Sequence, residues 1–313
     1  MPSKSSNPGK HHSRSYHQGK YNFDELTTAH AKLAPYVHTN KYGTQTIDFH
    51  NSDAVLALNT ALVKRYYKVA HWPLPAGTLC PAVPGRAEYI HCLSDFVDSA
   101  RQLVRSGRPS SISVLDVGTG ASLIYPIIGR SQYGWSFVGT DINEDSLHHA
   151  QSIIDQNKLS NITLRQQTDT KHILSGIIRD SDYFDMLMCN PPFYSSAYEA
   201  LAANQRKNKN LGYKDSSHRN FKGQDSELWY PGGELAFISK MIQESSLFGT
   251  QCYLYSTLVS QKGNVSTLVK QLQKSRCTEH RKVTIHIGNK TTTVLQWTYL
   301  NKKQQQAWRQ LRF

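Results

Sequence analysis

The tetrapeptide NPPF, formed by Asn190, Pro191, Pro192 and Phe193, ends an apolar, strand-like run. The Asn190 side-chain oxygen can accept a hydrogen bond from an NH₂ group, and the double proline fixes the backbone so that the Pro191 carbonyl can point the same way. Two such acceptors hold both protons of one exocyclic amine, while Phe193 stacks on the base and Tyr194 is expected on the same wall. The pattern predicts that a weakly nucleophilic amine is aimed at a methyl sulfonium. The alternative is a plain turn with a buried phenylalanine.

A glycine-rich turn, in the sequence VLDVGTGAS, follows the first strand of a regular α/β pattern. Gly118 and Gly120 let the backbone turn tightly and approach a ligand, and the next helix directs its free N–H groups into the same crevice. Leu123 stands where a dinucleotide fingerprint has its third glycine, which disfavours a pyrophosphate ligand. Ser122 is expected to cap the helix or to reach the ligand.

An acidic residue, Asp141, ends the second predicted strand, where a carboxylate can accept hydrogen bonds from both ribose hydroxyls. Together with the glycine turn, it indicates an adenosine-bearing cofactor without choosing among nicotinamide, flavin and S-adenosylmethionine. A plain strand–helix turn and a helix cap before Asn143 are the alternatives. After the third strand, Asp169 and Thr170 are expected either at the adenine of the cofactor or as a simple helix cap.

These motifs require strands and helices that alternate along the chain. Short apolar strands separated by amphipathic helices predict a mostly parallel sheet covered on both faces, and a short turn at 288–290 predicts an antiparallel C-terminal hairpin. The expected fold is therefore α/β, in the seven-stranded, Rossmann-like arrangement of class I S-adenosylmethionine-dependent methyltransferases. The predicted strands are 112–117, 135–141, 162–166, 183–189, 251–259, 282–287 and 291–300, with helices at 122–130, 144–157, 171–178, 233–247 and 263–275.

The composition is that of a globular protein, with 313 residues and 38% hydrophobic content. It contains no apolar run long enough to span a membrane, and the polar, basic N-terminus lacks the apolar stretch of a secretory signal. The five cysteines form no CxxC pair, which disfavours a disulfide framework or a cysteine zinc site. We expect a cytoplasmic monomer with no metal and no membrane partner.

The net charge of +13 lies outside the centre of the chain. Basic residues gather in 1–20, 203–225 and 301–313, a distribution that favours a polyanionic partner over generic solubility. We therefore expect a basic flexible arm over 1–20, an RNA-binding module over 21–108 and a methyltransferase domain over 109–313. A basic, aromatic insertion at 203–231 is predicted to be a lid that grips RNA.

The chain resembles the bacterial 23S ribosomal RNA adenine-N6 methyltransferases and, more distantly, the eukaryotic methyltransferase-like 16 enzymes. The resemblance covers nearly the whole chain and depends on several segments in order. They are HQGKYNF (17–23), IDFHNSDAVLALNTALV (47–63), CPAVPGRAEYIH (80–91), LDVGTGASLIYP (115–126), CNPPF (189–193) and GGELAFI (232–238).

This resemblance implies an S-adenosylmethionine cofactor and methylation of one adenine in 23S rRNA. It places Arg86 against the carboxylate of the cofactor's methionine part, a contact for which a guanidinium is well suited, although a structural ion pair is the alternative. Asn190 and Phe193 would serve the target base. The expected cofactor contacts are Arg86, Asp116, Gly118, Thr119, Gly120, Ser122, Asp141, Ile142, Asp169, Thr170 and Asn190.

Two other functions remain open at this stage. An Asn-Pro-Pro clamp also suits the amide of a protein glutamine, so a glutamine-N5 methyltransferase is the enzymatic alternative. A non-catalytic RNA-binding protein with a methyltransferase fold is the second, although Gly118, Asp141 and Asn190 argue against it.

Overall fold

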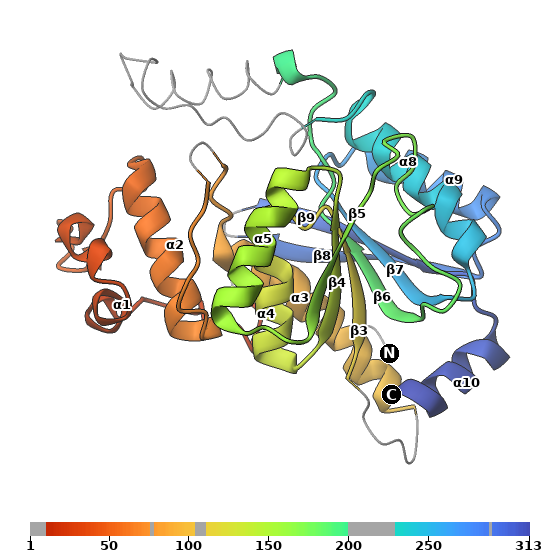
Figure 1. The fold of residues 1–313 in the computed structure, drawn as a ribbon, viewed down its shortest axis with the longest axis horizontal. Coiled ribbons are helices and arrows are strands. Elements are labelled where there is room, and N and C mark those ends of the chain that lie inside the picture. Colours follow the sequence, from red (N-terminus) through yellow and green to blue (C-terminus); the bar gives the residue numbers. More distant parts are fainter. Residues whose placement is uncertain (1–10, 76–77, 104–110, 200–228, 288–289) are drawn as a thin grey trace.

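The computed structural model describes residues 11–75, 78–103, 111–199, 229–287 and 290–313. Within these ranges, a seven-stranded sheet in the order β5-β4-β3-β6-β7-β9-β8 forms the centre (Figure 1). The neighbouring strands β5, β4, β3, β6 and β7 run parallel, and β9 pairs antiparallel with both β7 and β8. The predicted fold class is confirmed. The strands are β3 (Ser113–Val117), β4 (Ser136–Asp141), β5 (Ile162–Gln166), β6 (Phe184–Cys189), β7 (Cys252–Val259), β8 (Glu279–Ile287) and β9 (Lys290–Thr298).

Helices cover both faces of this sheet because its central strands are apolar on both sides. Alternate residues point to opposite faces, so that Val114 and Met186 enter one core while Leu115 and Leu187 enter the other. The first core lies under α3 (Val83–Arg101), α4 (Ile124–Tyr133) and α5 (Glu144–Asn157). The second lies under α8 (Gly233–Ser245), followed by η2 (Ser246–Phe248), and α9 (Asn264–Lys274).

The N-terminal region extends the first core beyond the sheet (Figure 1). Its long helix α2 begins after Asn51, whose side-chain oxygen accepts hydrogen bonds from the N–H groups of Asp53 and Ala54. Because α3 packs in the same core as α4 and α5, the N-terminal region and the sheet share one hydrophobic core. The domain boundary at 109 stays a prediction. The remaining elements here are α1 (Phe23–Ala29), η1 (Ala31–Tyr36), β1 (His38–Thr39), β2 (Gln45–Thr46) and α2 (Ser52–Tyr67).

Residues 11–20, part of the predicted flexible arm, contact α3 through side-chain hydrogen bonds, and the arm itself stays a prediction. The His11 Nδ1 atom lies 2.9 Å from a Glu88 carboxylate oxygen, and Arg14 donates to Asp98 at 2.6 Å. His17 is 2% exposed, with its ring nitrogens within hydrogen-bonding distance of two tyrosine hydroxyls. The basic side chains of His11 and Arg14 therefore contact carboxylates of the same protein.

Two helix assignments also need correction. Residues 171–178, predicted as a helix, form successive turns in which Gly176 has a φ of +86°. At the C-terminus, the sequence analysis noted only basic charge, whereas the structure has a helix, α10 (Lys302–Arg312), that begins with a capping box between Asn301 and Gln304. No helix in the described ranges is long and apolar enough to cross a membrane.

The predicted RNA-gripping insertion at 203–231 lies outside the described residues, apart from residues 229–231. The turn at 288–289 lies outside them as well.

Candidate active site

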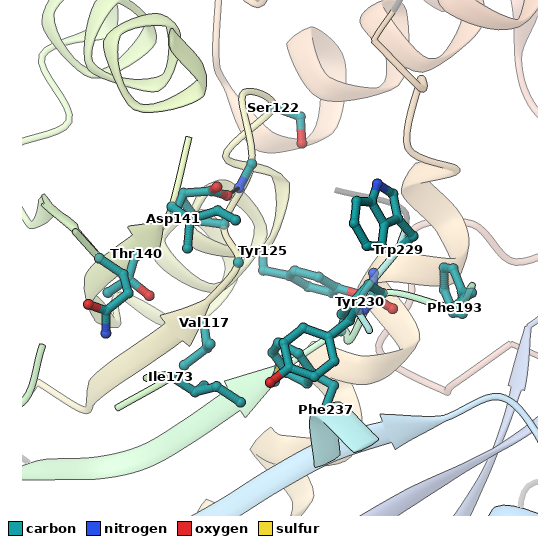
Figure 2. A pocket seen from close by; sticks show the side chains of 18 of the residues that line it. Val117, Ser122, Tyr125, Thr140, Asp141, Ile173, Phe193, Trp229, Tyr230 and Phe237 are labelled. Carbon is teal, nitrogen blue, oxygen red and sulfur yellow. Dashed lines mark hydrogen bonds between the residues drawn. The ribbon is translucent and has the colours of Figure 1, made fainter. Parts of the chain in front are cut away.

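A cavity of about 480 Å³ opens where β3, β4 and β6 end, at their carboxyl termini. Figure 2 shows side chains from these strand ends and from the helices around them pointing into the cavity. Ligands bind at this edge of a doubly wound sheet because the loops diverge there. The predicted site residues that line the cavity are Arg86, Gly118, Thr119, Gly120, Ser122, Asp141, Ile142, Thr170, Asn190, Pro192 and Phe193.

The glycine loop has the conformation that its sequence predicts. Gly118 and Gly120 have φ values of +75° and +63°, in the left-handed region that an L side chain rarely adopts. The N–H groups of Gly118 and Thr119 both donate to the Thr140 carbonyl, at 2.9 and 2.8 Å, so this turn is tied to the end of β4. The loop leaves room above Gly118, where an added Cβ would meet no atom within 4 Å.

Asp141 lies beside this loop and is 8% exposed (Figure 2). One carboxylate oxygen accepts from the Gly120 N–H at 3.0 Å, and the other accepts from the Asn143 N–H at 3.0 Å. Burial raises the pKa of the Asp141 carboxyl, although these N–H groups oppose the shift. Each oxygen keeps a further lone pair, so Asp141 serves the local backbone and can still accept from a ligand.

Asp116 was predicted as a cofactor contact, but it is not part of the cavity lining, whereas the next residue, Val117, is. It is fully buried, and neither carboxylate oxygen has a hydrogen-bond partner. Burial raises the pKa of the Asp116 carboxyl to about 7, and the nearby charge of Asp141 adds to the effect. The Thr119 side chain and the charge of Arg86 oppose this shift, and a cationic ligand bound nearby would favour the ionised form of the carboxyl.

Arg86 lines the cavity from α3, as the resemblance implies. Its Nη1 atom donates to the Tyr125 hydroxyl at 3.1 Å, and the guanidinium lies 5.6 Å from the centre of that ring. Among the described residues, the structure shows no carboxylate in ion-pair contact with Arg86. The alternative of a structural ion pair is therefore not seen, and the donors of the Arg86 guanidinium that Tyr125 does not use are available to a ligand.

The NPPF turn begins directly after β6, which pairs in parallel with β3 so that Cys189 lies opposite Val117. This register brings Asn190 next to the glycine loop. The Asn190 Oδ1 atom is buried and has no hydrogen-bond partner. Pro192 and Phe193 line the cavity, whereas Pro191 is buried and Tyr194 lies outside the lining, where its carbonyl accepts from the Tyr230 N–H at 3.0 Å.

An aromatic wall that the sequence analysis did not assign completes the site opposite Asp141 (Figure 2). Trp229 and Tyr230 had been placed in the lid, but they join Phe237 of α8 in the lining. The rings of Tyr230 and Phe237 meet edge to face at 5.1 Å. The Trp229 indole N–H is buried without a partner. A useful signal was available, because Trp229 and Tyr230 are separated only by Pro231 from the GGE sequence at the start of α8.

The third strand contributes less than predicted. Thr170 lines the cavity, but Asp169 does not, and its carboxylate instead accepts from the Lys171 N–H at 2.9 Å as a local turn. Gln167, His172 and Ile173, none of which was predicted, line this end of the cavity. No group of His, Cys, Asp and Glu side chains suited to a metal ion occurs among the residues that the structure describes.

A parallel sheet with an antiparallel hairpin, carrying a glycine loop, an acidic strand end and an NPPF turn around one cavity, defines a class I, Rossmann-like methyltransferase. The family described as RNA methyltransferase matches residues 5–301 of this chain, and the chain belongs to that family.

Bacterial relatives are similar over nearly the full length. A protein of Desulfotalea psychrophila (strain LSv54 / DSM 12343), named "Ribosomal RNA large subunit methyltransferase F", is 44% identical over 302 residues, covering 95% of this chain and 97% of the relative. A protein of the same name from Stutzerimonas stutzeri (strain A1501) is 43% identical over 305 residues, covering 95% of this chain and 92% of the relative. The resemblance seen in the sequence is confirmed.

Solved structures with the same fold come from human METTL16. Its catalytic domain in complex with MAT2A 3′UTR hairpin 1 has a TM-score of 0.77 and 26% identity, covering 94% of this chain and 96% of that one. Its N-terminal domain in complex with SAH has a TM-score of 0.73, covering 93% and 100%, and at 23% identity it supports the fold alone.

Proposed function

We infer that this protein transfers a methyl group from S-adenosylmethionine to the N6 atom of one adenine in 23S rRNA. The observation that carries the proposal is the buried, unpartnered Oδ1 atom of Asn190, a residue that lines the same cavity as the glycine loop. A buried polar atom without a partner is costly unless a ligand satisfies it. The names of the bacterial relatives support ribosomal RNA of the large subunit as the substrate.

The residues around the cavity fit S-adenosylmethionine. Asp141 offers carboxylate lone pairs for ribose hydroxyls, and the Arg86 guanidinium suits a carboxylate. Asp116 directly precedes Val117, which lines the cavity, and a cationic cofactor would favour the ionised form of this buried carboxyl. When bound, this cofactor supplies an electrophilic methyl group on a sulfonium.

The chain's own residues hold and orient the base. The Asn190 side-chain oxygen and the Pro191 carbonyl accept the two N6 protons, so the weakly nucleophilic amine is held in one direction. The same two oxygens stabilise the positive charge that develops on the amine. Phe193 supplies an aromatic face for a base that has left its stack. No general base is required, because the amine loses its proton after transfer.

An unpartnered acceptor and an unpartnered donor belong to the residues of the cavity and fit an adenine target. The amino edge of adenine presents an N–H donor beside a ring-nitrogen acceptor, whereas guanine presents a carbonyl oxygen at the corresponding position. Asn190, with an unpartnered acceptor at Oδ1, and Trp229, with an unpartnered donor at Nε1, both line the cavity. An acceptor and a donor suit an amino group beside a ring nitrogen, an edge that cytosine also presents, so the choice of adenine rests on the resemblance to adenine-N6 methyltransferases.

The N-terminal module and the basic insertion at 203–231 remain our proposal for holding the RNA, and cytoplasmic location and a monomeric state are proposed with them. The likeness to the RNA-bound catalytic domain of human METTL16 supports an RNA substrate.

The experiment is to incubate the protein with labelled S-adenosylmethionine and either 23S rRNA or a peptide-chain release factor. We expect label in N6-methyladenosine at a single position of the rRNA. Label in a glutamine of the release factor would identify the protein alternative. Cofactor binding without turnover on any rRNA substrate would identify a non-catalytic RNA-binding protein.

A further inference from the structure

Helix α8 carries two buried glutamates that the proposed reaction does not use. Glu234, in its first turn, is 1% exposed, and Glu244, in its last, is 3% exposed. Ten residues of helix separate them by about 15 Å along the axis. Both carboxylates accept several hydrogen bonds that offset the cost of burial, so the donors indicate what each glutamate holds.

The Glu244 carboxylate holds the turns that border the cavity at the third strand. Its Oε2 atom accepts from three successive backbone N–H groups, those of Ile173, Leu174 and Ser175, at 3.0, 2.7 and 3.1 Å. The His172 Nδ1 atom lies 3.3 Å from the other oxygen. Thr170, His172 and Ile173 line the cavity, so these bonds fix the backbone that presents them.

The Glu234 carboxylate holds the loop after β7, on the side of the NPPF turn. It accepts from the Ser260 N–H at 2.6 Å, the Gln261 N–H at 3.1 Å and the Asn264 side-chain amide at 2.9 Å. The Gln261 side chain reaches the Phe193 carbonyl, with a nitrogen–oxygen distance of 3.5 Å. A chain of contacts therefore leads from Glu234 to the residue that receives the base.

Helix α8 also connects to the aromatic wall. Glu234 follows Gly233, whose N–H donates to the Tyr230 carbonyl at 2.7 Å, and Phe237 lies on the same helix. The two ends of one rigid element thus reach the two ends of the cavity.

We propose that Glu234 and Glu244 are positioning residues with separable effects: Glu244 fixes the cofactor end of the site, and Glu234 fixes the target-base end. This inference rests on the proposed function, because it assigns the two ends of the cavity to cofactor and base. Neither carboxylate touches the cavity, so each acts through the backbone that it holds.

The test compares Glu244→Gln and Glu234→Gln, which keep the shape of the side chain and remove its charge. For Glu244→Gln, we expect the Kd for S-adenosylmethionine to rise about fivefold, with kcat at saturating cofactor and rRNA within about twofold of wild type. For Glu234→Gln, we expect that Kd to stay within about twofold, while kcat falls about tenfold. Calorimetric binding and single-site rRNA methylation supply the two readouts.

Asp185→Asn is the matched control. Asp185 is also a fully buried carboxylate, and it accepts from the Ser113 N–H at 2.9 Å and the Trp308 indole at 2.8 Å. It lies near the amino end of β6, away from Asn190. We expect the control to lower Tm without separating Kd from kcat.

Glu244→Asp and Gln261→Ala serve as second variants if a glutamine substitution prevents folding, and they should show smaller effects in the same directions. The proposal is overturned if Kd and kcat change together in both variants, if neither changes, or if Asp185→Asn reproduces the separation. A wild-type protein that binds no S-adenosylmethionine would instead overturn the proposed function, so the two failures are distinguishable.

Discussion

The Oδ2 atom of Asp141 accepts a 3.0 Å hydrogen bond from the backbone N–H of Gly120. This bond ties the end of β4 to the glycine loop that follows β3. The proposed ribose acceptor and the glycine loop therefore form one unit. Changing either residue should therefore disturb the cofactor pocket more than the rest of the fold.

Asp141→Ala should raise the Kd for S-adenosylmethionine by roughly tenfold or more, because it removes the ribose acceptor and leaves the Gly120 N–H without a partner. Isothermal titration calorimetry measures this change. Asp145→Ala, an exposed carboxylate in the first turn of α5, is the matched control and should bind as wild type. Unchanged binding by Asp141→Ala would remove this residue from the pocket.

The pKa of Asp116 gives a prediction about stability. An aspartate in an unfolded chain titrates near pH 4 (roughly), whereas burial raises the pKa of Asp116 to about 7 in the fold. Between these values, the folded protein holds a proton that the unfolded chain has lost, so this group's contribution to stability falls as pH rises through the window. Asp116→Asn carries no such proton and is free of this loss.

We therefore compare the Tm of ligand-free Asp116→Asn with that of wild type at about pH 4.5 and about pH 8. The Tm difference, mutant minus wild type, should be larger at the higher pH by roughly 2 °C or more. Differential scanning calorimetry at the two pH values gives the comparison. A constant difference between Asp116→Asn and wild type at the two pH values would contradict a raised pKa for the Asp116 carboxyl.

Trp229→Phe tests the proposed donor to the base. The substitution keeps an aromatic ring and removes the unpartnered indole N–H, so we expect kcat/KM for rRNA to fall about tenfold while cofactor Kd stays unchanged. Trp308→Phe is the control, because its indole donates to Asp185 and should affect Tm rather than turnover. Equal kcat/KM for Trp229→Phe and wild type would exclude a bond from this indole to the substrate.

The sheet and the motifs at its strand ends were predictable because both follow from local patterns. Alternating apolar strands and amphipathic helices determine the parallel order, and parallel strands bring their carboxyl ends to one edge. Gly118, Asp141 and Asn190 therefore meet at one cavity, although they are far apart in sequence. Their chemical roles remain predictions.

Other features of the fold depend on residues that are far apart in the sequence, so local sequence patterns could not predict them. The spacing in 171–178 suits a helix, but Gly176 adopts a left-handed φ. Glu244, which is 69 to 71 residues away in the sequence, accepts hydrogen bonds from the backbone N–H groups of this segment. The sequence of the basic segment at 11–20 is typical of a free arm, because its contacts with Glu88 and Asp98 of α3 depend on the fold. The aromatic wall follows a long polar stretch whose path the sequence does not give.

The measurement that tests the account most directly is the single-turnover rate of methyl transfer to 23S rRNA by Asn190→Ala, at saturating rRNA and S-adenosylmethionine. We expect the rate to fall by roughly a hundredfold or more, with cofactor Kd within about twofold of wild type and an unchanged circular dichroism spectrum. A rate equal to that of wild type would mean that the Asn190 side chain does not hold the target amine, and it would contradict the proposed chemistry.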